Sequence, residues 1–219
     1  MMQIELVDSM GTDLTVVNSA RVSFAKTKKK VGESDKKLIR YLAEHNHWSP
    51  FAHTSLQFYI KAPMFVARQL AKHQVGLVWN EVSRRYINTE PEYWKANNKW
   101  RKAADDKKQG SSIDLIASQQ IAEHAYADAC RHSVDAYKLL ISMGVCPEQS
   151  RAVLPVSLYT EWYWSGSVYA FSRVCKLRMA KDAQKETQDV VSEISFRCKQ
   201  AFPLSWAALK DSVREPEWR

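Results

Sequence analysis

The chain has 219 residues, which is long enough for one substantial hydrophobic core, and its length does not require a second domain. Apolar residues make up 45% of it, and no run of about 18 apolar residues occurs, so a membrane-spanning helix is not expected. The formal net charge of +8 fits an acidic partner, either a nucleic acid or an acidic small molecule such as a nucleotide.

The first part of the chain alternates between strand-like and helix-like patterns of apolar residues. The expected elements are, in chain order, a strand at 3–7, helices at 14–23 and from Glu33, a polar break at 45–50, a strand at 54–61, and a helix from Pro63 to Lys72 or His73. Gly76 then allows a turn. The basic run from Lys26 to Lys30 lies in a polar stretch, which favours a solvated loop over a ligand role.

The second part of the chain is dominated by helical periodicity. The expected elements are a loop at 94–112, a long helix near 112–143 capped by Gly144, a short helix at 147–151 stopped by Pro155, a β-prone segment at 158–164, and helices at 167–178 and 184–202. Together these patterns predict an α+β fold over residues 1–219 as a single domain. A small antiparallel or mixed sheet is expected to pack against several helices.

The cysteines and the N-terminus both indicate a cytoplasmic protein. The four cysteines, Cys130, Cys146, Cys175 and Cys198, are widely spaced and form no CxxC pair, which predicts reduced thiols that serve as small core residues. The N-terminus lacks the basic and then apolar layout of a signal peptide.

Residues 68–86, RQLAKHQVGLVWNEVSRRY, carry the densest set of functional side chains. Arg68, Lys72, Arg84 and Arg85 surround one histidine, one carboxylate and several amide and hydroxyl groups. Such a set suits a polyanionic ligand that also carries a hydrogen-bonding ring, in other words a nucleotide. The alternative is a helix end and turn with a solvated basic face.

The same segment resembles the signature of the flavin-dependent thymidylate synthases, which usually runs Arg-His-Arg and then, after a short gap, Ser. Here the triplet is Lys72-His73-Gln74, and the gap to Ser83 is one residue longer than usual. Further segments agree with this family in order and spacing. They are ELVDSMGTDL near the start, ARVSF, HWSPFAH, KAPMFVARQ, SRAVLP, LYTEWYW and KLRMAKDAQKETQ.

The resemblance implies reductive methylation of dUMP to dTMP. Methylenetetrahydrofolate would donate the carbon, and NADPH would reduce FAD, which carries the hydride. It also implies a homotetramer with active sites shared between subunits, and neither a nucleic acid nor a membrane is expected as a partner. No cysteine lies in a matched motif, so a cysteine nucleophile is not expected.

The resemblance also implies a set of cofactor-binding residues. They are Ser23, His47, Ser49, Lys72, His73, Gln74, Asn80, Glu81, Ser167, Tyr169, Arg173 and Leu177. Some positions depart from the family pattern: Ala52 stands where a Glu is frequent, and Lys72 and Gln74 replace arginines. Arg173 stands where the family commonly has Asn, and Tyr169 where it commonly has Arg, so we expect Arg173 to compensate for the altered triplet.

The implied substrate-binding residues are Gln69, Lys72, Glu81, Ser83, Arg84, Arg85, Arg151 and Arg178. Arg178 is the expected catalytic residue, because a guanidinium can stabilise the uracil anion that forms when the N3 proton leaves. The structural alternative for Arg178 is an ion pair with Asp182, one helical turn further on. Ser83 has no triad-like histidine in the sequence pattern and is interpreted as a nucleotide hydrogen bonder, not as a nucleophile.

Two other function classes remain open. One is a catalytically inactive relative that binds flavin or nucleotide, which the altered triplet favours. The other is a basic nucleic-acid-binding module, which the net charge favours. A metal site is not expected, because His47 and His53 have no carboxylate between them and no HExxH or CxxC pattern accompanies them. Without the resemblance, these histidines would be interpreted as ordinary hydrogen-bonded residues of a turn.

Overall fold

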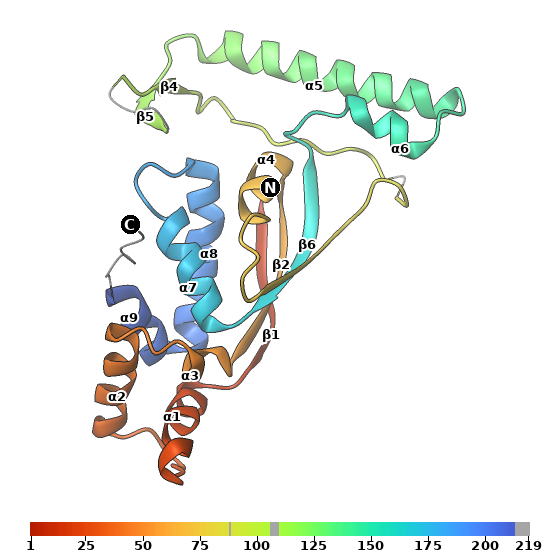
Figure 1. The fold of residues 1–219 in the computed structure, drawn as a ribbon. Helices are drawn as coiled ribbons and strands as arrows, with labels where there is room; N and C mark the ends of the chain where they lie inside the picture. Colours follow the sequence, from red (N-terminus) through yellow and green to blue (C-terminus); the bar gives the residue numbers. More distant parts are fainter. Residues whose placement is uncertain (88, 106–109, 213–219) are drawn as a thin grey trace, which may run out of the picture.

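The computed structural model describes residues 1–87, 89–105 and 110–212, and its centre is a four-stranded antiparallel sheet in the order β1-β2-β6-β3 (Figure 1). The strands are β1 (Gln3–Met10), β2 (Ser55–Pro63), β3 (Leu77–Glu81) and β6 (Tyr159–Gly166). Every second residue of β2 points into the core, where Leu56, Phe58 and Ile60 are fully buried. The strand predicted from this alternation is confirmed.

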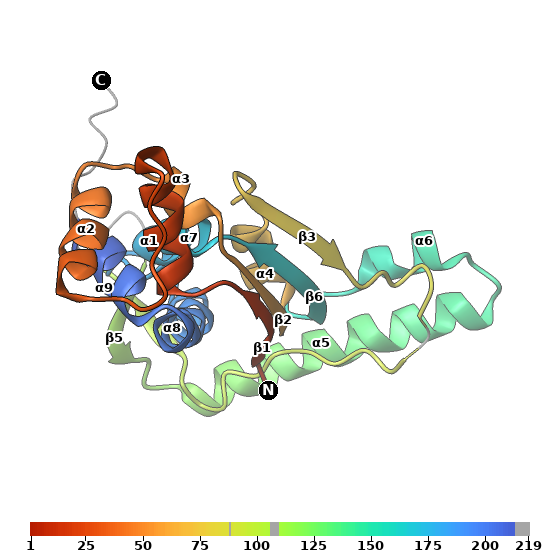
Figure 2. The ribbon, with the colours of Figure 1, turned by 90° about the horizontal axis from the view of Figure 1, so that it is seen from below.

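Helices cover only one face of this sheet. Figure 2 shows α7 (Val168–Arg178) and α8 (Lys185–Ala201) together on one side of it. Phe171 of α7 packs edge-on against Phe58 and Trp164, with ring centroids 5.0 and 5.3 Å apart. On the other face Val78 and Tyr163 are 65% and 48% exposed, so the described residues leave this side of the sheet uncovered.

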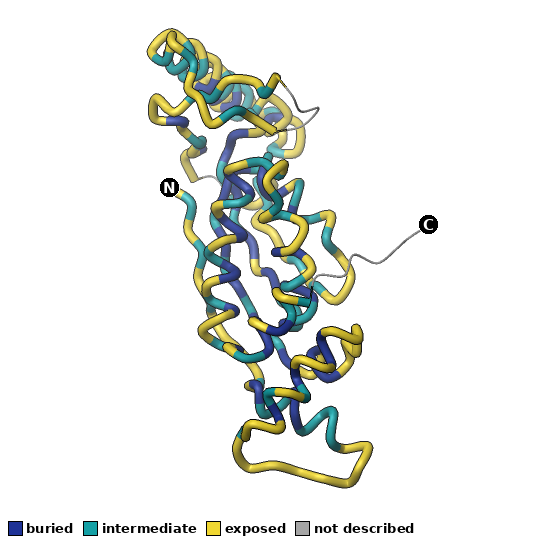
Figure 3. The backbone as a smooth tube through the Cα atoms, turned by 90° about the vertical axis from the view of Figure 1, so that its left-hand side faces the viewer, coloured by how far each residue is buried: buried dark blue, intermediate teal, exposed yellow. Residues whose placement is uncertain are grey.

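A helical layer closes the end of the molecule remote from α5, the long helix described below (Figure 1). It consists of α1 (Asp13–Arg21), the 3-10 turn η1 (Val22–Phe24), α2 (Glu33–Glu44), α3 (Ser49–Ala52) and α9 (Pro203–Asp211). The buried carboxylate of Asp13 accepts hydrogen bonds from the backbone N–H groups of Leu204 and Ser205, at 2.9 and 2.8 Å, which joins α1 to the start of α9. Residues 26–30, between α1 and α2, are exposed throughout (Figure 3).

The long helix α5 (Gln119–Ser142) crosses the opposite end of the sheet (Figure 1). Gly144 ends it with a φ of +85°, as predicted, because its N–H reaches back to the carbonyl of Ile141. The predicted short helix at 147–151 is present as α6 (Pro147–Ser150), and a 3-10 turn that was not predicted, η2 (Arg151–Val153), follows it. The helix α4 (Met64–Leu70) lies near this end and joins β2 to the turn before β3.

The prediction of a loop at 94–112 leading directly into a helix from 112 was wrong. A small hairpin of β4 (Arg101–Ala103) and β5 (Ser111–Leu115) occupies part of this range, and residues 106–109 lie outside the described residues. The helix therefore begins only at Gln119, whose side chain accepts from the backbone N–H of Trp100 at 2.8 Å and donates to its carbonyl at 2.7 Å. These two bonds fix the hairpin to the start of α5.

Three smaller differences also appear. Cys146 is exposed, whereas Cys130, Cys175 and Cys198 are buried as expected. Cys146 directly precedes the short helix α6, where a small side chain has no core to enter. The polar break at 45–50 contains the start of α3, and α9 was not expected at all. The strand β3 was not predicted either, but the α+β architecture as a whole is the predicted one.

Candidate functional site

Arg178, the predicted catalytic residue, lines a cavity of about 520 Å³ where four elements meet. The cavity lies between the end of α4, the β4–β5 hairpin, the end of α7 and the segment that leads into α8. Its lining residues are Gln69, Lys72, Arg101, Gly110, Ser111, Arg178, Asp182, Ala183 and Gln184. We refer to this space as the Arg178 cavity. Three of its side chains are cationic and one is anionic, so it favours an acidic ligand.

The guanidinium of Arg178 is oriented by His73. Its Nε donates to Nε2 of His73 at 2.9 Å, and its Nη2 donates to the backbone carbonyl of Gln69 at 3.4 Å. Burial lowers the pKa of the half-buried His73, and the cations Arg178 and Arg173 lower it further. A neutral imidazole is the form that can accept this bond, so the pKa and the geometry agree.

The alternative interpretation of Arg178, an ion pair with Asp182, is not what the structure contains. Both residues line the cavity, but among the described residues no ion pair joins them. Arg178 is instead held by a neutral ring and a carbonyl, neither of which carries a negative charge.

The side chain of Gln69 is fixed from two sides. Its amide nitrogen donates to Oε1 of Gln184, and its amide oxygen accepts from the hydroxyl of the buried Thr187 at 3.3 Å. The amide of Gln184 donates in turn to Oε2 of Glu186 at 3.0 Å. Gln69 therefore presents one remaining N–H and one lone pair in a set direction.

A second and larger cavity, of about 930 Å³, lies beside β6 and η2. The predicted substrate-binding residues among its lining are Glu81, Arg84 and Arg151, and Arg68 and Glu148 also line it. We refer to it as the Arg151 cavity. Glu81 is anchored there, because its carboxylate accepts from the Thr160 hydroxyl at 2.6 Å and from the Trp79 indole N–H at 3.1 Å.

Three residues of the NEVSRRY segment, Ser83, Arg84 and Arg85, have partners in or near this cavity. Arg84 donates to the backbone carbonyl of Thr89 at 2.5 Å. The Ser83 hydroxyl accepts from the backbone N–H and the Nε of Arg85, both at 3.3 Å, and Arg85 lies 3.7 Å from Glu148. Among the described residues, both hydrogen bonds of the Ser83 hydroxyl are to Arg85, so its contacts do not resemble those of an activated nucleophile.

Several predicted cofactor-binding residues form one stripe along α7. Tyr169, Arg173 and Leu177 are four residues apart and share a helix face, and Arg173 and Leu177 are exposed. At one end of the stripe Tyr169 donates to Asn46 at 2.9 Å, beside His47 and Ser49 of the α3 region. At the other end Arg173 is close enough to His73 to influence its pKa.

The remaining predicted residues take varied positions. Ser167 caps α7, where its hydroxyl accepts from the Ala170 N–H at 3.2 Å. Gln74 and Asn80 are exposed on either side of the turn at Gly76. Ser23 lies in η1, at the end of the molecule remote from α5 (Figure 1), so the single chain does not bring it to either cavity.

Sequence reasoning missed Arg101, Gln184, Glu186 and Thr187, which surround the Arg178 cavity or fix its residues. Gln184, Glu186 and Thr187 belong to the matched segment KLRMAKDAQKETQ, which could have pointed to them. Arg101 lies in a stretch without apolar periodicity, where nothing distinguishes it from the neighbouring basic residues.

Comparison with known proteins gives the family. Residues 5–204 match the family described as thymidylate synthase complementing protein. The flavin-dependent thymidylate synthase of Thermus thermophilus is 38% identical over 212 residues, which cover 97% of this chain and 77% of that one. The chain belongs to the flavin-dependent thymidylate synthase family.

Other members of this family agree over nearly the whole chain. The flavin-dependent thymidylate synthase of Thermosipho africanus is 37% identical, over 94% of this chain and 89% of its own. Among solved structures, the UMP/dUMP methylase PolB from Streptomyces cacaoi, bound with 5-Br dUMP, superposes with a TM-score of 0.86 at 29% identity. It covers 95% of this chain and 94% of its own.

Two features are absent from the described part of the chain. No helix in it is long and apolar enough to cross a membrane. Nor does it contain a group of three or more His, Cys, Asp or Glu side chains arranged to hold a metal ion.

Proposed function

We propose that this chain catalyses the reductive methylation of dUMP to dTMP, with methylenetetrahydrofolate as the carbon donor and FAD, reduced by NADPH, as the hydride carrier. The observation that carries the proposal is the Arg178 guanidinium, held by neutral His73 beside Gln69 and Lys72 in a cavity of suitable charge. Family membership and the likeness to a methylase bound with 5-Br dUMP support it.

Arg178 suits the step that makes uracil reactive. C5 of neutral uracil is a weak nucleophile, and loss of the N3 proton raises the electron density at C5. A guanidinium stays protonated in proteins, so Arg178 cannot take that proton. It can stabilise the anion that remains, and because His73 and the Gln69 carbonyl already orient it, little reorganisation is needed during the reaction.

The α7 stripe and the residues around His73 suit a flavin dinucleotide. Lys72 and Arg173 offer cations for its phosphates, while Tyr169 and Leu177 offer an aromatic and an apolar surface for its rings. Arg173 lies close to the Lys72-His73-Gln74 triplet, which supports its role as the compensating cation. When bound, FAD supplies the hydride that completes the methyl group.

The two cavities favour a site assembled from more than one subunit. Arg68 and Gln69 are consecutive residues of α4, yet Arg68 lines the Arg151 cavity and Gln69 the Arg178 cavity. Successive helix residues are turned by about 100°, so these side chains face different sides of α4. In a homotetramer, the Arg151 cavity of one subunit would complete the Arg178 cavity of another.

The proposal is tested by the release of tritium from C5-labelled dUMP. Purified protein is supplied with FAD, NADPH and methylenetetrahydrofolate, and each component is omitted in turn. Release that requires all three is the expected result. No release from protein with bound FAD would favour an inactive relative. Absence of both release and flavin binding would overturn the proposal, and a salt-sensitive affinity for nucleic acid would then favour the basic module.

A further inference from the structure

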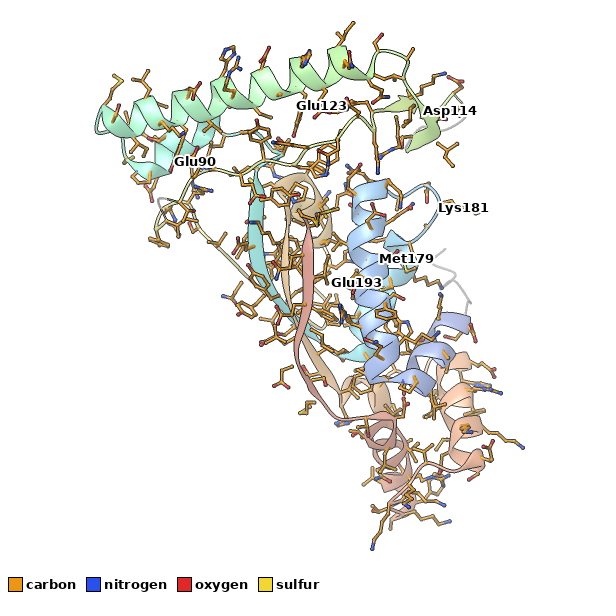
Figure 4. All side chains as sticks on the ribbon, turned by 180° about the vertical axis from the view of Figure 1, so that it is seen from behind. Glu90, Asp114, Glu123, Met179, Lys181 and Glu193 are labelled. Carbon is orange, nitrogen blue, oxygen red and sulfur yellow. The ribbon has the colours of Figure 1, made fainter. Side chains whose placement is uncertain are left out.

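The β4–β5 hairpin contributes a cation to the Arg178 cavity. Arg101 of β4 lines this cavity together with Lys72 and Arg178, although it comes from a segment far from both in the sequence. Figure 4 shows Asp114 of the hairpin above Met179 and Lys181, in the segment that joins α7 to α8. Gly110 approaches the same segment, because a Cβ built on it would lie 3.7 Å from the backbone oxygen of Asp182.

The guanidinium of Arg101 is held in one orientation by two partners. Its Nη2 donates to Oε1 of Glu186 at 2.7 Å, and its Nε donates to the hydroxyl of Ser111 at 2.7 Å. Among the described residues Nη1 has no hydrogen-bond partner, so this nitrogen is available to a ligand. An arginine fixed on one edge and open on the other is preorganised to bind an anionic oxygen.

Glu186 connects this arginine to the substrate-binding glutamine. The residue is only 6% exposed, and each oxygen of its carboxylate has a different partner. Oε1 accepts from Arg101, and Oε2 accepts from the amide of Gln184 at 3.0 Å. Because Gln184 accepts in turn from Gln69, one buried carboxylate orients side chains on both sides of the cavity.

We propose that Arg101 binds an anionic group of the ligand in the Arg178 cavity, and that Glu186 positions Arg101 and Gln69 for this ligand. This inference rests on the proposed function and extends it to Arg101, which lies outside the segments that resemble the family, and to Glu186, for which the resemblance implied no role. The shared chemistry is an oxyanion, which can be the phosphate of dUMP or a carboxylate of the folate.

The first test uses the FAD-loaded enzyme with Arg101→Gln, and Lys102→Gln as the matched control. Lys102 is the exposed neighbour on the same strand, so both variants lose one positive charge from β4. Loss of a charge-assisted hydrogen bond should weaken ligand binding about 10- to 100-fold in Arg101→Gln. Binding in Lys102→Gln should stay within about twofold, because rim charges act mainly through screened, long-range attraction.

The two sources of the oxyanion are separated by measuring dUMP affinity, deoxyuridine affinity and the KM for methylenetetrahydrofolate. Weaker dUMP binding with unchanged deoxyuridine binding assigns the contact to the phosphate. A raised folate KM with unchanged dUMP binding assigns it to the carboxylate. If Arg101→Gln leaves all three values within about twofold of the wild type, the Arg101 assignment is wrong.

The role of Glu186 is tested by a double-mutant cycle. Glu186→Gln alone should raise the dissociation constant or KM of the ligand that Arg101 binds about 10-fold. Glu193→Gln is the control on the same helix, because the Glu193 carboxylate pairs with Arg197, and it should leave this value unchanged. If Glu186 acts through Arg101, adding Glu186→Gln to Arg101→Gln should cost clearly less than it does in the wild type. Fully multiplicative effects would reduce Glu186 to a structural residue and overturn this part of the proposal.

These outcomes are separable from failure of the proposed function. A wild-type enzyme that neither binds dUMP nor releases tritium overturns the function, and the inference with it. A wild type that does both while Arg101→Gln behaves like Lys102→Gln overturns the inference alone.

Discussion

The Arg178 cavity and the Arg151 cavity differ in how their polar side chains are held. Around Arg178 the groups are fixed through half-buried or buried partners: His73 holds the arginine, and Gln184 and Thr187 hold Gln69. Around Arg151 most charged side chains are exposed, and the Arg85–Glu148 pair spans 3.7 Å. A fixed guanidinium suits the stabilisation of a transition state, whereas exposed cations suit capture of a charged ligand.

The largest expected effect is the loss of kcat in Arg178→Ala. Loss of one preorganised group that stabilises developing charge should lower kcat about 100- to 1000-fold, while FAD remains bound. Turnover is measured by tritium release, and flavin content by absorbance. Arg178→Lys keeps the charge but loses the Nε bond to His73, so its kcat should also fall steeply. An Arg178→Lys enzyme with wild-type kcat would mean that charge alone matters and that the fixed geometry does not.

Arg151→Ala should show the opposite kinetic pattern. An exposed cation holds the ligand equally strongly in the ground state and in the transition state. Its removal therefore raises KM and leaves kcat unchanged. We expect the KM for dUMP to rise about 10-fold, as for the loss of one charge-assisted hydrogen bond. Arg131→Ala is the control, because Arg131 is an exposed arginine of α5 whose ion pair is with Asp128, one helical turn away. A large loss of kcat in Arg151→Ala would remove the distinction between the two cavities.

The sequence predicted the fold more completely than the site. Strand alternation and helical periodicity located β1, β2, β6 and most helices, but not β3, since these patterns record which side chains face the core. The hairpin at 101–115 escaped because its exposed strands leave no apolar alternation. Arg101 was overlooked for the same reason. Its contact with Glu186 also gives no signal in the sequence, because the two residues are 85 positions apart.

Contacts between individual site residues were equally hidden from the sequence. The resemblance implied roles for His73 and Arg178, but not that one accepts a hydrogen bond from the other across 105 positions. The resemblance also left the separation into two cavities unstated. That separation depends on the direction in which α4 turns Arg68 and Gln69, which follows from how its apolar residues Val66, Ala67 and Leu70 are buried.

A smaller effect is expected for Arg173→Ala, which tests whether the exposed α7 stripe binds FAD. Removal of one solvent-exposed cation should weaken FAD binding about 5- to 10-fold. Lys199→Ala, a similar loss of exposed charge on α8, should leave it unchanged. FAD affinity is measured by quenching of flavin fluorescence. If the two variants bind FAD equally well, Arg173 does not compensate for Lys72 and Gln74.

The smallest effect is the pH dependence of stability that His73 contributes. Burial and two cations lower its pKa in the folded protein below the unfolded value of about 6.5. As the pH falls through about 6.5, the unfolded state therefore binds a proton that the folded state does not, and the folded state loses stability. His73→Gln keeps an acceptor for Arg178 and has no proton to gain.

The measurement is urea unfolding of both proteins at pH 7.5 and 5.5, at one protein concentration. Because His73 is only half-buried and solvent screens its charge, the loss on acidification should be smaller in His73→Gln by about 0.5 kcal/mol. An equal loss in both proteins would mean that His73 is protonated as readily in the folded as in the unfolded state. A protonated His73 cannot accept a hydrogen bond from Arg178. The fixed geometry that distinguishes the Arg178 cavity would then be lost at acidic pH.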